Sequence, residues 1–141
     1  MTTTSDRFPP IAQALHWLTA LAIFIAFPLG VALEKARPDM MDTLYRAHWS
    51  FGLLALALVL LRIANRFAAT MPGPYPSLTR FEATASAIVH KLLYLLMVAV
   101  PLGGWLGKSA YGGAITVFGL FDMPALLAQD QALGEKILGV H

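Results

Sequence analysis

Four histidines, His16, His48, His90 and His141, are the residues of this sequence whose type and placement could do chemistry. Three of them lie inside or at the start of long apolar segments. Placing an imidazole there costs free energy, so it seldom occurs without a partner. In a helical bundle, several imidazoles can ligate haem iron. The chain has no cysteine, which excludes disulfides, thiolate metal sites and c-type haem attachment. The sequence therefore favours ligation of haem iron by histidine.

The composition indicates what surrounds these histidines. The 141 residues suffice for one domain, 1–141, and are 57% hydrophobic but only 13% charged. A soluble domain carries about 25% charged residues, so this chain has too little charge to cover a surface that faces water. The net charge of +2 is too small and too scattered for nucleic-acid binding. We predict an integral membrane protein whose surroundings are lipid.

Apolar runs of the right length predict three membrane spans, at residues 13–34, 44–66 and 81–106. The first contains 20 consecutive residues without a formal charge, Ala14–Leu33, which cover about 30 Å as a helix. That run is too long for a cleaved signal peptide and has a weak basic start. The charged segment 34–46 is predicted to be a connection between the first two spans.

The remaining segments complete a predicted all-α membrane fold. Prolines and a glycine make residues 69–79 a loop. Residues 112–131 are too short and interrupted to span, so we predict an interfacial loop there. Residues 132–141 would begin a fourth helix. The fold class is an up-down transmembrane helix bundle with three full spans plus the start of a fourth.

Alternating spans would set the histidines at two depths in the membrane. His16 and His90 would share one level, and His48 and His141 the other, so that each pair could grip one porphyrin. Taken singly, a histidine near a helix end more often contacts lipid headgroups or bonds a neighbouring helix. A terminal histidine such as His141 has little meaning alone.

Two further residues fit a flat cofactor. Gly52 lies one helical turn after His48 and would leave room for a large ring. Arg62 lies about 21 Å along the helix from His48, near the level of His16 and His90, where a guanidinium could pair with haem propionates. The alternatives are that Gly52 serves helix packing and that Arg62 marks a span end at the headgroups.

Several motifs, taken together and in order, resemble the bacterial cytochrome b561 family of small di-haem b membrane cytochromes. They are Ile11-Ala12-Gln13-Ala14-Leu15-His16-Trp17, then His48-x-x-x-Gly52 with Arg62 and Arg66, then His90-Lys91-Leu92-Leu93-Tyr94-Leu95-Leu96 leading to Pro101, and finally Phe118-Gly119-Leu120 near Pro124.

The resemblance implies a four-helix bundle with two b-type haems, of which this chain would hold one or two, ligated by His16, His48, His90 and His141. It implies an oxidoreductase or electron carrier of the bacterial inner membrane, multi-pass, that moves electrons between a donor at one face and quinone. Some members oxidise superoxide and reduce ubiquinone. Members continue through a complete fourth helix, so we expect further sequence, a homodimer partner or another chain to complete the bundle.

Two other functions stay open on the sequence. The chain could be the haem-bearing membrane anchor of a dehydrogenase or hydrogenase. It could also be a non-redox assembly or transporter subunit whose histidines bond between helices. No residues form an acid/base pair or a nucleophile, so we assign no catalytic residue. On the superoxide reading, Lys35, Arg37 and Arg46 would form a positive rim that attracts the anion.

Overall fold

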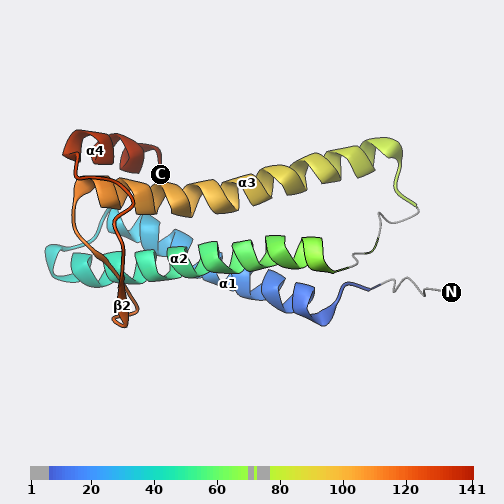
Figure 1. Ribbon diagram of the computed structural model, residues 1–141, viewed down its shortest axis with the longest axis horizontal. Helices are drawn as coiled ribbons and strands as arrows, with labels where there is room; N and C mark the ends of the chain where they lie inside the picture. Colours follow the sequence, from blue (N-terminus) through green and yellow to red (C-terminus); the bar gives the residue numbers. More distant parts are fainter. Residues whose placement is uncertain (1–6, 70–71, 73–76) are drawn as a thin grey trace.

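The computed structural model describes residues 7–69, 72 and 77–141 of the chain. Successive helices run in opposite directions (Figure 1). They are α1 (Pro10–Leu33), α2 (Pro38–Ala68), α3 (Arg80–Tyr111) and the short α4 (Gln131–Val140). The first three are long and apolar enough to cross a membrane. The predicted fold class, three spans plus the start of a fourth helix, is confirmed.

Local sequence signals set the helix starts. Pro10 and Pro38 open α1 and α2, at the position where a missing N–H costs nothing and the fixed φ suits a helix. A capping box opens α3: the Thr79 hydroxyl accepts from the Glu82 backbone N–H, and the Glu82 carboxylate accepts from the Thr79 N–H at 2.8 Å. In α4, the Asp130 side chain accepts from the Leu133 N–H at 3.0 Å.

The helices extend beyond the predicted spans, since α2 begins before residue 44 and α3 ends after residue 106. Helix α2 begins at Pro38, so most of the segment 34–46 is helical rather than a connection. Asp39 in its first turn complements the helix dipole, and the Asp42–Arg46 ion pair stabilises the next turn. Helix α3 continues past residue 106 to Tyr111 with Pro101 inside it, as membrane helices tolerate. In the predicted loop 69–79, residues 70–71 and 73–76 lie outside the described residues.

The predicted interfacial loop 112–131 holds a β-hairpin that the sequence did not reveal. Its strands β1 (Ile115–Val117) and β2 (Phe121–Met123) pair antiparallel, with Ile115 opposite Met123. The turn between them has positive φ at Phe118 (48°) and Gly119 (72°), and the Leu120 N–H donates to the Val117 carbonyl at 2.9 Å. This is the geometry of a type I′ turn, which suits hairpins. The hairpin crosses α2 (Figure 1).

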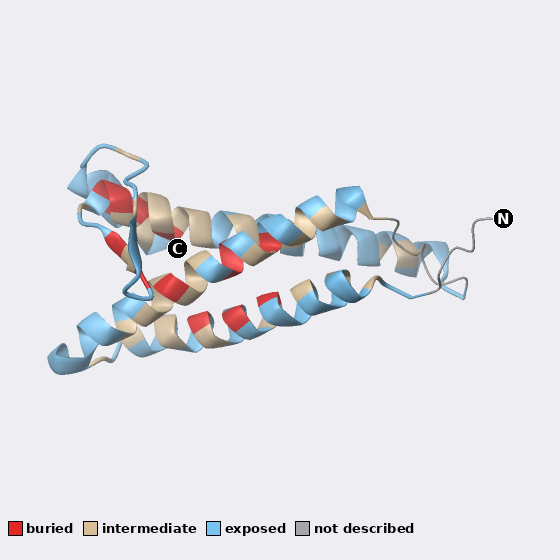
Figure 2. Ribbon diagram, turned by 60° about the horizontal axis from the view of Figure 1, so that its bottom comes forward, coloured by how far each residue is buried: buried red, intermediate tan, exposed pale blue. Residues whose placement is uncertain are grey.

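The core is thin and lies mainly between α1 and α2. Small side chains, among them Ala22, Ala26 and Ala55, are buried there beside Val59 and allow close helix approach. Helix α3 diverges from α2 towards its Arg80 end in the view of Figure 1. Its buried residues all lie between Gly104 and Ala110, and Figure 2 shows buried segments of the chain near the hairpin. The bundle is therefore closed at the hairpin end and open at the end where α3 begins.

Candidate functional site

His48 and His141 form a close pair at the hairpin end of the bundle. Their ring centroids lie 5.9 Å apart, and the ring planes are 77° from parallel. A histidine nitrogen binds a metal at about 2 Å, so two imidazoles on opposite sides of one iron have centroids about 6 Å apart. The spacing of His48 and His141 fits that arrangement.

Each of these two rings is oriented by a backbone carbonyl. Nδ1 of His48 donates to the Ala26 carbonyl at 2.9 Å, and Nδ1 of His141 donates to the Val100 carbonyl at 2.8 Å. A carbonyl can only accept, so the proton is on Nδ1 and the Nε2 lone pair is left for a metal. Metal-binding histidines are commonly held in this way. The donor set therefore fits haem iron in chemistry as well as in spacing.

Gly52, one turn after His48, faces open space. A Cβ added there would have no other atom within 4 Å. The next residue on the same helical face, Ala55, is buried. The room beside His48 that the sequence predicts is thus present, and its use by a porphyrin stays a prediction.

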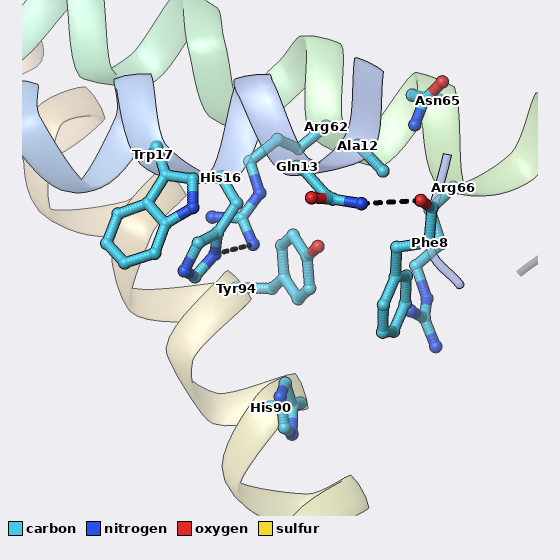
Figure 3. Close-up of a pocket in the computed structure, with 10 residues that line it drawn as sticks. All are labelled: Phe8, Ala12, Gln13, His16, Trp17, Arg62, Asn65, Arg66, His90 and Tyr94. Atoms are coloured by element: carbon cyan, nitrogen blue, oxygen red, sulfur yellow. Dashed lines mark hydrogen bonds between the residues drawn. The ribbon is translucent and has the colours of Figure 1, made fainter. Parts of the chain in front are cut away.

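The other two histidines line one pocket at the open end of the bundle. His16 on α1, Arg62 on α2, and His90 and Tyr94 on α3 border a cavity of about 310 Å³ (Figure 3). Tyr94 lies near His16 and Arg62, and His90 lies one helical turn away along α3. The structure thus brings together the three residues predicted at this level.

The two histidines of this pocket differ in their partners. The Arg62 guanidinium donates to Nδ1 of His16 at 3.2 Å and lies 5.3 Å from the centroid of the Tyr94 ring. Arginine cannot accept, so a neutral His16 carries its proton on Nε2, and iron binding through Nε2 requires Arg62 to release Nδ1. His90 is already arranged for a metal, because its Nδ1 donates to the Ser86 carbonyl at 2.7 Å.

The described residues hold no group of three or more His, Asp or Glu side chains that could bind a bare metal ion. Pairs of imidazoles instead suit a metal that brings its other ligands with it, as haem iron does.

Comparison with known proteins identifies the family. Residues 7–141 match the profile described as prokaryotic cytochrome b561. The chain belongs to the prokaryotic cytochrome b561 family. It is 33% identical over 144 residues to cytochrome b561 homolog 2 of Escherichia coli K12, across 99% of this chain and 76% of that protein. It is 24% identical to a probable superoxide oxidase, CybB, of Yersinia pestis, across 96% and 76%. It is 29% identical to cytochrome b562 of Cereibacter sphaeroides, across 79% and 70%.

Membership of the cytochrome b561 family implies haem b and makes this chain a membrane cytochrome. The positive rim expected of Lys35, Arg37 and Arg46 is weakened at its two arginines. Arg37 is paired with Asp39 at 2.5 Å, and Arg46 is paired with Asp42. Each pair is neutral, so it contributes little to a field that attracts anions.

In this cytochrome b561 chain, a different cation lies against the Trp49 ring of α2. Nζ of Lys108 lies 4.9 Å from the ring centroid of Trp49, the residue after His48, and 5.8 Å from that of Tyr111. Within the described residues, Lys108 has no carboxylate within salt-bridge distance. Reasoning from the sequence missed Lys108 because its contact with Trp49 depends on how α3 packs against α2.

Proposed function

We propose that this cytochrome transfers electrons between a donor at the membrane surface and quinone through b-type haem held by His48 with His141 and by His16 with His90. One observation carries the proposal: the rings of His48 and His141 are spaced for a shared iron and both have Nδ1 bonded to a carbonyl. If these histidines served only to hydrogen-bond neighbouring helices, two adjacent imidazoles that both keep Nε2 available would not be needed.

Bound haem would supply reversible one-electron exchange at its iron. The chain's own residues orient the imidazoles through the carbonyls of Ala26 and Val100. If a histidine pair held each haem, electrons would enter and leave without a substrate bound to the metal. Arg62 places a positive charge at the level of His16 and His90.

We propose superoxide as the donor and ubiquinone as the acceptor. The relative named as a probable superoxide oxidase supports this choice. Two superoxide anions would each lose one electron to become dioxygen. One quinone would take up both electrons and two protons from water to become quinol. Because three helices are long and apolar enough to cross a membrane, an apolar quinone would reach the protein from the lipid.

Detergent-purified protein tests the proposal in two steps. Reduced-minus-oxidised spectra should show b-type bands, and a pyridine haemochrome assay should give the number of haems per chain. Superoxide generated enzymatically should then reduce added ubiquinone-1 faster with this protein than with His48→Ala/His90→Ala protein. A folded preparation without b-type bands would overturn haem binding. Haem that superoxide does not reduce would overturn the donor, and a stable complex with a dehydrogenase would then support the anchor function.

A further inference from the structure

Two helix glycines stand out because each is covered by one of the paired imidazoles. A Cβ added to Gly30 of α1 would lie 2.9 Å from Cε1 of His48. A Cβ added to Gly104 of α3 would lie 2.8 Å from Cε1 of His141. Carbon atoms attract one another best at about 3.5–4.0 Å, so neither ring could keep its place beside an alanine.

The same geometry occurs at both positions. His48 bonds the carbonyl of Ala26, four residues before Gly30, and His141 bonds the carbonyl of Val100, four residues before Gly104. In an α-helix, residues four apart lie on the same face, so carbonyl and glycine form one notch. The notches on α1 and α3 have the same two parts, although the histidines come from different helices.

We propose that Gly30 and Gly104 are positioning residues for the His48/His141 pair, each letting an imidazole lie against a neighbouring helix and bond the carbonyl four residues earlier. The inference deepens the proposed function, because the notch would set both the tautomer and the plane of each iron ligand. With an alanine, the ring must turn or withdraw, and the bond from Nδ1 to the carbonyl is lengthened or lost.

Helix propensity predicts the direction in which a Gly→Ala substitution changes stability when no side chain obstructs it. Alanine is favoured over glycine inside a helix, so Gly→Ala in open space should be neutral or stabilising. Gly103 provides the matched control for Gly104: it is the adjacent residue of α3, and an added Cβ would meet nothing within 4 Å. A loss at Gly104 without a loss at Gly103 would therefore report on the contact with His141.

The first test is the electron paramagnetic resonance spectrum of the oxidised protein, because the g-values of low-spin ferric haem depend on the angle between its imidazole planes. Gly30→Ala and Gly104→Ala should each shift the signal of the haem held by His48 and His141, and Gly103→Ala should not. Signals of that haem identical to wild type in both variants would overturn the proposal.

The second test needs no haem, so it separates this proposal from the proposed function. Gly30→Ala should lower the thermal unfolding midpoint of the wild-type chain by a few degrees, because the loss from overpacking is partly offset by the higher helix propensity of alanine. In a His48→Ala chain the obstructing ring is gone, and the same substitution should be neutral or stabilising. Equal effects in both backgrounds would overturn the proposal, even if the protein proved to bind no haem and the proposed function failed.

Discussion

Nδ1 of His141 and the carbonyl of Val100 join the short α4 to the middle of α3 at 2.8 Å. This contact brings the last residue of the sequence beside His48 on α2, with ring centroids 5.9 Å apart. The pair therefore depends on all four helices: α2 carries His48, His141 follows the end of α4, and carbonyls of α1 and α3 orient the two rings.

The pairing of the histidines can be tested by single substitutions. If His48 and His141 share one iron, His48→Ala and His141→Ala should remove the same haem, and the double variant should lose no more than either single one. His16→Ala and His90→Ala should remove the other haem. Haem content and redox titration of each purified variant measure this. Loss of different haems by His48→Ala and His141→Ala would show that the pairing is wrong.

Arg62 should raise the reduction potential of the haem held by His16 and His90. A nearby positive charge disfavours the more positive ferric state, so Arg62→Gln should lower the midpoint potential of that haem by tens of millivolts. Spectroelectrochemical titration measures the change, and the haem of the other pair is the internal control. Asn65→Ala, which changes another residue of the same pocket without removing a charge, should have a smaller effect. An unchanged potential in Arg62→Gln would place the guanidinium away from that haem.

Ser50 should hold the hairpin onto α2. Its hydroxyl is buried and accepts from the Phe118 N–H at 2.8 Å, and the Phe51 and Phe118 rings pack edge to face beside it. Ser50→Ala leaves that N–H without a partner, which costs about 1–3 kcal/mol. Hydrogen exchange of residues 115–123 should accelerate by about tenfold or more.

Ser109→Ala is the matched control for that experiment. The Ser109 hydroxyl accepts from the Leu126 N–H at 3.2 Å, so its loss should loosen the segment near residue 126 and leave the hairpin unchanged. Equal exchange in the hairpin of wild type and Ser50→Ala would mean that the Phe51–Phe118 contact holds it without the hydrogen bond.

The sequence predicted the features that depend on helix rise and chain direction. Alternating spans and a rise of about 1.5 Å per residue were enough to place Arg62 at the level of His16, where the structure puts it. The hairpin was missed because its strands have three residues each and its turn uses Phe118 in the left-handed region, which β-propensity does not reveal. The notch at Gly30 was missed because it depends on which helix packs against His48, a fact that periodicity within one helix does not contain.

Lys108, rather than the paired arginines, should guide an anionic donor. Lys108→Gln should lower the rate of haem reduction by superoxide several-fold at low salt, and the remaining rate should depend less on ionic strength. The control removes a neutral pair: Arg37→Gln/Asp39→Asn should leave the rate within about twofold of wild type, because the field far from a neutral pair is weak. Stopped-flow reduction over a range of salt measures both. If Arg37→Gln/Asp39→Asn lowered the rate more than Lys108→Gln did, the positive rim predicted from the sequence would be supported instead.

Gly134 should determine where α4, and with it His141, lies. A Cβ added to Gly134 would lie 2.6 Å from the Tyr111 Cα, and backbone cannot move aside as a flexible side chain can. Gly107 of α3 receives α4 in the same way, since an added Cβ there would lie 2.8 Å from Cγ of Leu138. Both glycines are buried: Gly134 lies against the backbone of α3, and Gly107 lies against side chains of α4, so α4 packs closely on α3 at both points.

Gly134→Ala should therefore displace α4 and remove the haem shared by His48 and His141, while the haem of His16 and His90, which involves no residue of α4, is retained. Gly139→Ala is the control on the same helix: its added Cβ would meet nothing within 4 Å, and both haems should remain. Haem content and the spectrum of each variant measure the outcome. Loss of both haems in Gly134→Ala would mean that α4 supports the whole bundle, and loss of neither would mean that His141 reaches the iron without the close packing of α4 on α3.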